Sequence, residues 1–207
     1  MEFDPDSMST RDVYLKMVSL ITPRPIAWVS TLSQTGVANL APYSFFNGIG
    51  ANPPSLMFAP VNRRDGSRKD SLLNVENNGQ FVVNVVSFEQ AESMNQTSAD
   101  FDSETSEFSA CGLTPLESMK VSPPRVAEAK ASFECELLQT LHLGTGPAGA
   151  NLVIGRIVMI HVADEVVTES GEILPESLDT IGRLGGAGYS RTTDRFDLQR
   201  PDPPTAS

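Results

Sequence analysis

Residues 23–47, PRPIAWVSTLSQTGVANLAPYSFFN, decide the fold that we expect for this chain. Two apolar runs, at residues 26–31 and 37–41, flank a short polar stretch that ends in Gly36. Glycine adopts positive φ angles without steric cost, so the pattern predicts two strands joined by a tight turn. We expect the second strand to stop at Pro42, because proline has no N–H to donate to a neighbouring strand.

Aromatic and small polar residues follow this predicted hairpin, in the order Tyr43, Ser44, Phe45, Phe46 and Asn47. Aromatic faces next to short polar groups suit a flat, apolar ligand that also carries hydrogen-bonding edges. An aromatic plug of the hydrophobic core explains the same residues without any ligand. Both explanations stay open at this point.

Beyond the hairpin, short strands alternate with turns and helices. The expected strands are residues 55–61, 80–86, 131–143 and 151–163, and the expected helices are residues 10–21, 67–78 and 87–97. Many short strands punctuated by turns favour a β-barrel or a sandwich over a doubly wound sheet. Residues 98–125 are polar and acidic, and we expect a long surface excursion there.

Three hydroxyl residues mark where the predicted helices begin. Thr10 precedes the first apolar residue of the first helix and is a candidate N-cap. Ser67 stands three residues before Asp70, and Ser87 stands three residues before Gln90. This spacing predicts a capping box at the second and third helices, in which the hydroxyl accepts from a backbone N–H.

The composition limits the classes of function. The chain has 207 residues, 40% of them hydrophobic, and a net charge of −11, which repels nucleic acid and anionic membranes. No apolar run approaches the roughly 20 residues of a membrane helix, and the acidic N-terminus lacks the apolar segment of a signal peptide. We expect a cytoplasmic protein with one domain over residues 1–207, flexible at residues 1–9 and 199–207, and without nucleic-acid or membrane partners.

Metal ligands and catalytic side chains do not stand out. Cys111 and Cys135 lie far apart with no CxxC spacing, and His142 and His161 belong to no ligand-spaced cluster. We therefore expect free thiols in a reducing compartment and no metal site. The sequence also shows no convincing nucleophile or acid–base pair, so the catalytic residues stay unknown and a bound cofactor is expected to carry the chemistry.

One short segment concentrates positive charge in this acidic chain. It contains Arg63, Arg64, Arg68 and Lys69, and the last two fall in the first turn of the helix expected to begin at Ser67. A helix N-terminus offers unpaired N–H groups and a positive partial charge, so it favours phosphate, and cations there are unfavourable unless an anion compensates them. The pattern indicates a small anionic ligand; an ordinary solvated helix is the alternative.

Two glycine-rich segments are candidates for ligand-binding loops. Residues 144–149 match GxGxxG, but they lie between two predicted strands and contain Pro147, so we interpret them as a hairpin loop. Residues 183–191 form a basic and aromatic loop that could close over a ligand, with Arg183 meeting negative charge and Tyr189 stacking. A plain surface loop is the alternative.

The order of these motifs resembles a known family. RPIAWVSTLSQTGVANLAPYSFFNGIGANPPSLMF followed by SRKDSLLNVENNGQFVVNVV, and later LVIGRIVMIHV and IGRLGGAGYSR, are similar to the flavin reductase-like family of FMN-binding split barrels. The resemblance covers roughly residues 10 to 198. It implies a mainly β (α+β) fold, namely a six-stranded antiparallel Greek-key split β-barrel with surrounding helices. It also implies a homodimer with flavin near the subunit interface.

The resemblance further implies an NAD(P)H-dependent flavin reductase, with hydride transfer from NADH or NADPH to the flavin. The cofactor is FMN, with FAD possible, and reduced flavin or electrons would pass to an acceptor such as a partner monooxygenase. The cofactor-binding residues implied on this sequence are Thr31, Tyr43, Ser44 and Asn47 near the ring or ribityl chain, Ser67, Arg68, Lys69, Asp70 and Ser71 at the phosphate, and Arg183 and Tyr189 in the closing loop.

Three other functions remain open from the sequence. One is a different split-barrel oxidoreductase, such as a pyridoxamine-phosphate-oxidase-like protein or one that uses a deazaflavin or quinone. Another is a non-catalytic flavin-binding or electron-relay module, which would hold cofactor without oxidising NAD(P)H. The last is a small acidic barrel that mediates assembly and holds no cofactor.

Overall fold

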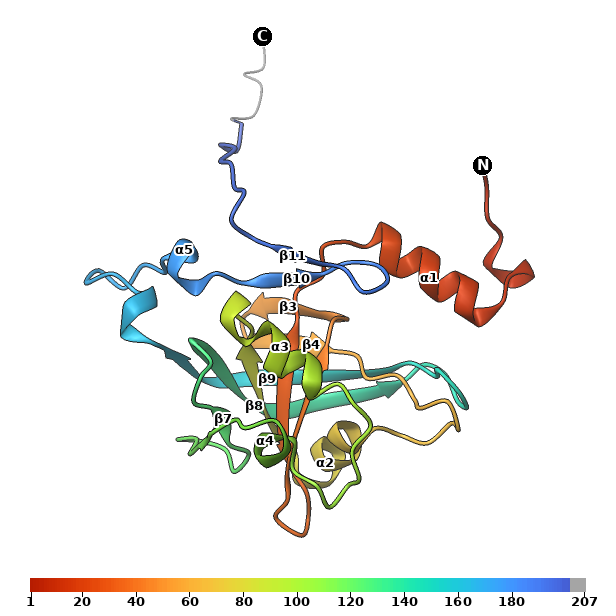
Figure 1. Ribbon diagram of the computed structural model, residues 1–207, viewed down its shortest axis with the longest axis horizontal. Coiled ribbons are helices and arrows are strands. Elements are labelled where there is room, and N and C mark those ends of the chain that lie inside the picture. Colours follow the sequence, from red (N-terminus) through yellow and green to blue (C-terminus); the bar gives the residue numbers. More distant parts are fainter. Residues whose placement is uncertain (202–207) are drawn as a thin grey trace.

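A seven-stranded antiparallel sheet organises the chain, in the order β2-β1-β5-β8-β9-β4-β3. The structure, a computed structural model, describes residues 1–201 (Figure 1). The sheet strands are β1 (Ala27–Leu32), β2 (Ala38–Tyr43), β3 (Phe46–Ala51), β4 (Pro54–Phe58), β5 (Gln80–Val85), β8 (Ala131–His142) and β9 (Asn151–Val162). Two small hairpins join β6 (Pro115–Leu116) to β7 (Arg125–Val126) and β10 (Ile181–Arg183) to β11 (Tyr189–Arg191).

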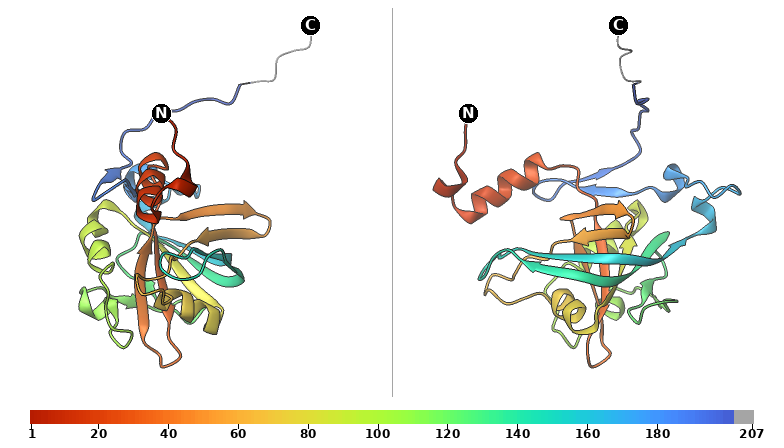
Figure 2. Two further views of the ribbon diagram at one scale, coloured as in Figure 1. Left: turned by 90° about the vertical axis from the view of Figure 1, so that its right-hand side faces the viewer. Right: turned by 180° about the vertical axis from the view of Figure 1, so that it is seen from behind.

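Short helices surround the sheet (Figure 1). They are α1 (Thr10–Leu20), α2 (Asp70–Asn78), α3 (Ala91–Gln96), α4 (Glu107–Ala110) and α5 (Pro175–Leu178), with 3-10 turns η1 (Pro5–Ser7), η2 (Phe88–Gln90) and η3 (Asp164–Val166). Helix α1 and the β10–β11 hairpin lie across one end of the sheet, and α2 lies toward the opposite end (Figures 1 and 2). None of the helices within residues 1–201 has the length and apolar character needed to span a bilayer.

The expectation of a mainly β, antiparallel fold is confirmed, but the count of six strands is wrong. The seventh strand, β3, was interpreted as part of an aromatic corner. It contains Gly48 and Gly50, and nearly all of it is exposed, so its sequence lacks the alternation of buried and exposed residues that marks a strand. Pairing with β4, and not apolar patterning, makes these residues a strand.

Pro42 does not end its strand as predicted. Strand β2 continues to Tyr43, and Pro42 stands opposite Trp28 of β1. Because β2 is an edge strand, the missing N–H of Pro42 costs no hydrogen bond on its open side. The chain then turns directly into β3, so the two edges of the sheet are consecutive in sequence.

The predicted capping residues are wrong at all three helices. Ser9, not Thr10, caps α1, because its hydroxyl accepts from the N–H of Asp12. Ser87 makes no capping bond; its hydroxyl donates to the carbonyl of Leu178 across the fold. The third case, Ser67, affects the candidate site and is described below. At both predicted serine caps, the hydroxyl donates to an oxygen outside the helix: Asp65 Oδ1 for Ser67 and the Leu178 carbonyl for Ser87.

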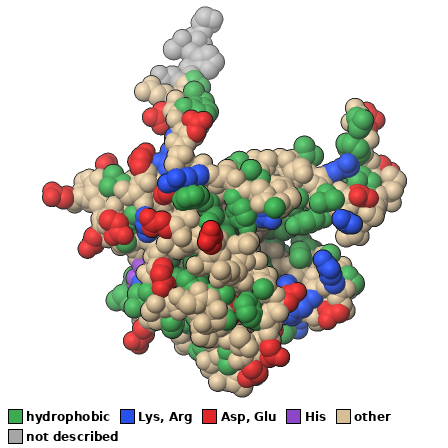
Figure 3. All heavy atoms as spheres, in the orientation of Figure 1, with side chains coloured by type: hydrophobic (Ala, Val, Ile, Leu, Met, Phe, Trp, Pro, Cys, Tyr) green, Lys and Arg blue, Asp and Glu red, His purple; other side chains and the backbone are tan. Residues whose placement is uncertain are grey.

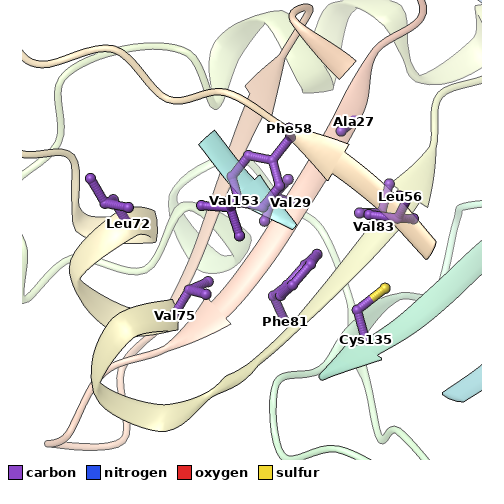
Figure 4. Close-up of a cluster of buried hydrophobic side chains, with 10 residues drawn as sticks. All are labelled: Ala27, Val29, Leu56, Phe58, Leu72, Val75, Phe81, Val83, Cys135 and Val153. Atoms are coloured by element: carbon purple, nitrogen blue, oxygen red, sulfur yellow. The ribbon is translucent and has the colours of Figure 1, made fainter. Parts of the chain in front are cut away.

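The inner face of the sheet holds the main core (Figure 4). Its fully buried aromatics, Phe58 and Phe81, meet with ring centroids 5.3 Å apart. Gly155, in the middle of β9, presses on Phe81: a Cβ at Gly155 would lie 2.3 Å from Phe81 Cζ. Opposite Gly155, the register of the paired strand β8 skips Leu138, so the local bulge lies on β8. Gly155 therefore serves close packing.

A second apolar cluster covers the other face of β1. Trp28 lies at its centre, fully buried, and its indole N–H donates to Thr97 Oγ1 at 2.9 Å. Some members come from the predicted polar excursion, including Phe108 and Leu113. This excursion is thus more ordered than expected, since it contributes α4, the β6–β7 hairpin and part of a core.

The expectations for the chain ends are only partly covered by the structure. Residues 5–7 form η1, within the segment expected to be flexible. Residues 199–201 have no regular secondary structure, and residues 202–207 of the predicted flexible tail lie outside the described residues. The glycine-rich residues 144–149 join β8 to β9, which confirms their interpretation as a hairpin loop.

Candidate functional site

A pocket opens between the start of α2 and the segment that follows α3. It holds about 460 Å³ of empty space, counting the part open to solvent. Its lining combines β2, the residues before and at the start of α2, and residues from the predicted excursion. The lining residues are Asn39, Ala41, Pro42, Tyr43, Arg63, Lys69, Asp70, Ser71, Thr97, Ser98, Ala99, Asp100, Phe101 and Glu107.

Helix α2 begins at Asp70, three residues later than predicted. Its N-cap is Lys69, which makes no side-chain capping bond. Ser67 cannot act as the cap, because its hydroxyl and its N–H both donate to Asp65 Oδ1, at 2.6 and 2.8 Å. The N–H groups of Asp70 and Ser71 have no acceptor within residues 1–201, as is usual for a first helical turn. These two donors therefore border the pocket.

Positive side chains around this helix start are paired with carboxylates. Arg63 pairs with Asp70, and Lys69 Nζ lies 3.0 Å from Asp100 Oδ1 on the far wall of the pocket. Arg68 precedes the helix instead of lying in its first turn, and it pairs with Glu76 outside the pocket lining. Lys and Arg side chains gather over the loop between β4 and α2 (Figure 3). This face is basic on an acidic protein.

Hydroxyl and amide groups line the floor beside this charge. Asn39 Nδ2 donates to Ser71 Oγ at 2.9 Å, and Tyr43 lines the same part of the pocket. Burial raises the pKa of Tyr43 to about 12, so its phenol stays protonated at neutral pH. The Tyr43 ring packs on Phe58 of the core, with centroids 5.2 Å apart. The floor is therefore a rigid, neutral hydrogen-bonding surface.

Glu107 is a pocket residue that the sequence did not indicate. Its side chain is buried, and Oε2 accepts from the N–H of Leu40 at 2.8 Å. Burial raises the pKa of Glu107 above its usual range, and the nearby charge of Asp70 raises it further. Glu107 lies in α4 and reaches β2 across 67 residues of chain. No local pattern announces such a contact.

Four of the predicted cofactor residues line this pocket: Tyr43, Lys69, Asp70 and Ser71. The other members of the predicted phosphate and ring sets lie elsewhere. Thr31 is fully buried on β1, where its hydroxyl accepts from Asn74 Nδ2 at 3.1 Å. Ser67, as described, is held by Asp65.

The corner after β2 is held by a buried arginine. Arg24 is 4% exposed, donates to the carbonyls of Val18 and Ile21 at the end of α1, and reaches Ser44 Oγ at 3.3 Å. Ser44 therefore serves to fix this corner. Asn47 is exposed on β3, and its side chain accepts from the N–H of Gly48.

The closing-loop residues lie together in the β10–β11 hairpin. The Arg183 guanidinium stacks 4.5 Å from the centroid of the Tyr189 ring and donates to the carbonyls of Gly186 and Gly188. Tyr189 in turn reaches Asn95 Oδ1 at 3.2 Å, on the helix that leads into the pocket wall. The β10–β11 hairpin therefore contacts α3, which precedes the pocket wall, but it supplies no lining residue of the pocket.

Comparison with known proteins places the chain in a family. The model of the flavin reductase like domain matches residues 18–178. The chain belongs to this flavin reductase-like family. The match includes the pocket and the main core, and it confirms the resemblance drawn from the sequence.

Solved structures of similar proteins share the fold over almost the whole chain. Nitrilotriacetate monooxygenase component B from Bacillus cereus is 36% identical, with a TM-score of 0.90, covering 96% of this chain and 98% of that one. The 2-nitrobenzoate 2-nitroreductase NbaA from Pseudomonas fluorescens is 32% identical, with a TM-score of 0.88, covering 97% and 96%. A split barrel protein from Shewanella frigidimarina is 28% identical, with a TM-score of 0.82, covering 97% and 100%.

The donors in the pocket fit the phosphate end of a flavin nucleotide. Lys69 and Arg63 supply positive charge, and the start of α2 supplies two free N–H groups, the combination that binds phosphate at helix N-termini. The hydroxyl of Ser71 borders the same space. Metal binding has no comparable support: residues 1–201 contain no group of three His, Cys, Asp or Glu side chains arranged to hold an ion.

Proposed function

We propose that this flavin reductase-like protein binds FMN and works as an NAD(P)H-dependent flavin reductase that delivers reduced flavin or electrons to an acceptor. The observation that carries the proposal is the pocket at the start of α2, where phosphate donors lie next to the Tyr43 corner. The component B similarity supports a partner monooxygenase as the acceptor. We further propose one functional domain over residues 1–207, acting in the cytoplasm.

In this proposal the protein positions the cofactor. Lys69, with Arg63 and the N–H groups of Asp70 and Ser71, would hold the phosphate. The corner at Tyr43 and Ser44, with Asn47 and Thr31, remains proposed for the ring and ribityl side, Ser67 and Arg68 for the phosphate loop, and Arg183 and Tyr189 for closure. When bound, FMN would supply the redox chemistry between NAD(P)H and the acceptor.

A homodimer is also proposed. The end of α1 exposes Leu20 at 80% and Ile21 at 54%, and β3 exposes Ile49 at 54%. Exposed apolar side chains of this size on a protruding helix and an edge strand favour contact with another protein surface. Sedimentation analysis of the purified protein tests this, and a monomer at micromolar concentration would contradict it.

An absorbance spectrum tests the cofactor directly. The purified protein is recorded from 350 to 500 nm, as isolated and after addition of FMN and gel filtration, and then again after anaerobic NADH or NADPH. We expect a flavin band near 450 nm that bleaches with reductant. A band that persists with both reductants would favour the relay module, and retention of no flavin at all would contradict cofactor binding.

Two variants locate the phosphate. Lys69→Ala removes a pocket cation and should weaken FMN binding by about 10- to 100-fold, since charge-assisted bonds contribute roughly 1.5–3 kcal/mol. Riboflavin, which lacks phosphate, should bind both forms alike. Arg68→Ala is the matched comparison, because Arg68 pairs with Glu76 outside the pocket. A larger loss for Arg68→Ala than for Lys69→Ala would move the phosphate from the pocket to the preceding loop.

A second candidate function is reduction of an organic acceptor at the same site. The 32% identity to a 2-nitrobenzoate 2-nitroreductase favours it. The test is consumption of 2-nitrobenzoate by the FMN-loaded protein with NADPH under anaerobic conditions. Loss of the nitro compound in fixed proportion to NADPH oxidised, with one NADPH for each two-electron reduction step, would support this function. NADPH oxidation without such loss would leave free flavin or a partner protein as acceptor.

A further inference from the structure

One wall of the pocket is a short exposed segment between two buried anchors. We name residues 98–105 the flap. Thr97, just before it, is 1% exposed and bonded to Trp28, and Glu107 and Phe108, just after it, are buried. Within the flap every residue is exposed except Phe101, which is half-buried. The ends of the flap are therefore fixed, while its middle has little packing to hold it.

Within the described part of the chain, one ion pair joins the flap to the opposite wall. It is the ion pair between Asp100 Oδ1 and Lys69 Nζ, at 3.0 Å. The other hydrogen bonds of the flap within residues 1–201 are local, from Ser98 and Ala99 back to the end of α3 and among residues 99–105. The Asp100 carboxylate thus sits on one of the two cations that line the pocket.

The same contact opposes the ligand proposed for this site. A phosphate group and the Asp100 carboxylate would both bind the Lys69 ammonium, and the phosphate carries the larger negative charge. The pKa of Asp100 is lowered by its hydrogen bond and charge interaction with Lys69, so the aspartate is ionised at neutral pH and competes fully. Asp102 and Glu104 add further negative charge to the flap, which a bound phosphate would repel.

We propose that Asp100 is an internal competitor for the phosphate of the flavin, so that phosphate binding at Lys69 displaces Asp100 and releases the flap. This inference rests on the proposed function and extends it. Asp100 then sets how strongly the site prefers phosphorylated flavin, because its carboxylate opposes FMN and has no effect on riboflavin. The flap becomes the part of the pocket that responds to an occupied phosphate site.

The test compares Asp100→Asn with wild type for FMN and for riboflavin, by titration calorimetry in low salt. The asparagine keeps the shape and removes the charge. An exposed ion pair contributes about 0.2–1 kcal/mol, so FMN should bind up to about fivefold tighter, with riboflavin unchanged. In a Lys69→Met background the same substitution should change nothing. Asp102→Asn is the matched control: it removes a flap charge that touches no pocket cation, and FMN affinity should stay within about 1.5-fold.

Hydrogen–deuterium exchange gives a second readout that does not depend on affinity. Amides of residues 98–105 should exchange faster in wild type with FMN than without it, and in Asp100→Asn they should already be fast without FMN. Riboflavin should leave the wild-type rates unchanged.

Three results would overturn the proposal. Weaker FMN binding by Asp100→Asn would mean that Asp100 orients Lys69 toward the phosphate. An equal gain for Asp102→Asn would reduce the effect to the general field of the flap. If wild type binds FMN but Asp100→Asn changes neither the FMN affinity nor the exchange rates of residues 98–105, the proposed role of Asp100 is contradicted and the proposed function stands. If wild type binds no flavin at all, the proposed function itself is contradicted.

Discussion

Glu134 and Glu107 are both buried glutamates, but their surroundings give them opposite electrostatic behaviour. Glu134 of β8 is fully buried and is hydrogen-bonded to three groups: the N–H of Met119 at 2.8 Å, the N–H of Lys120 at 2.6 Å and His161 Nε2 at 2.6 Å. Burial by itself would raise the pKa of Glu134, but these partners together hold it below its usual range. Glu134 therefore stays ionised and connects the loop before β7 to the sheet. We call Glu134 with Met119, Lys120 and His161 the clasp.

Within residues 1–201, the N–H of Leu40 is the one donor that another residue supplies to the Glu107 carboxylate, and the charge of Asp70 lies nearby. Burial therefore prevails, and the pKa of Glu107 is raised. Both carboxylates are buried, so burial does not explain why their pKa values shift in opposite directions. The difference teaches that the number of hydrogen-bond donors decides whether an interior carboxylate is stabilised in its ionised form. The carboxylate with fewer donors is the one that borders the candidate site, a location where groups with shifted pKa values are typically found.

Glu134→Ala should have the largest effect on stability. It leaves two backbone N–H groups and His161 without their acceptor, and loss of one partner of a buried pair costs about 3–5 kcal/mol. Urea unfolding measures the change. Glu136→Ala, two residues along the same strand and exposed, is the control and should stay within about 0.5 kcal/mol. Equal losses in both variants would mean that the clasp contributes nothing specific.

The pH dependence should separate the two glutamates by sign. The folded pKa of Glu134 is lowered, so its contribution is fully present above its ordinary value of 4.5 and is lost as the pH falls through the folded pKa. The folded pKa of Glu107 is raised, so its contribution is present below 4.5 and is lost as the pH rises through the folded pKa.

Urea unfolding of wild type, Glu134→Gln and Glu107→Gln from about pH 2.5 to pH 8 tests these signs, because the Glu134 contribution changes below its ordinary pKa of 4.5 and the Glu107 contribution changes above it. The stability difference between wild type and Glu134→Gln should grow as the pH rises from the acid end of the scan to about 4.5 and then level off. The difference between wild type and Glu107→Gln should shift in the opposite direction. Parallel curves for the two variants would contradict the contrast between the sites.

The second histidine–glutamate pair is an exposed counterpart of the clasp. His142 Nε2 lies 3.2 Å from Glu76 Oε1, and the His142 side chain is 48% exposed. Water competes with such a pair, so Glu76→Gln should cost only about 0.2–1 kcal/mol, although Glu76 also meets Arg68. The loss should shrink further in 1 M NaCl. If Glu76→Gln lowers the free energy of unfolding as much as Glu134→Ala does, and salt does not change that loss, then solvent exposure does not determine how much these pairs contribute to stability.

Glu107→Gln should have the smallest effect. The glutamine oxygen can still accept from the N–H of Leu40, and the substitution removes a buried charge. Stability at pH 7 should stay within about 0.5 kcal/mol of wild type or rise. A melting curve at pH 7 measures this. A loss above about 1 kcal/mol would mean that the ionised carboxylate has a further partner and would remove the distinction from Glu134.

Local pattern predicted much of the sheet. The runs at residues 26–31, 80–86, 131–143 and 151–163 became β1, β5, β8 and β9, because buried apolar residues in a strand leave a readable alternation or run. Strand β3 left no such trace, since its residues are exposed and held by pairing alone. The caps failed for a related reason, as both predicted serine caps bond to other oxygens, Ser67 to Asp65 and Ser87 to Leu178.

The candidate site was predicted in part, from one side. Lys69 borders the pocket, as the charge argument suggested, and so do Asp70 and Ser71, which only the family resemblance implied. The opposite wall, with Asp100 and Glu107, comes from a segment interpreted as a surface excursion. Its contacts join residues 31 and 67 positions apart, which no periodicity in the sequence encodes.

The sequence by itself determined the strands that carry apolar runs, the family, the cluster of basic residues and the helix after it, since each depends on neighbours a few residues apart. The tertiary structure alone decided which carboxylates meet Lys69 and Leu40, which glutamate gains enough donors to stay charged, and that the flap forms one wall of the pocket. The physical reason is that burial, pKa and ion pairing depend on distances of a few ångströms between segments far apart in the chain, and these exist only once the sheet has assembled.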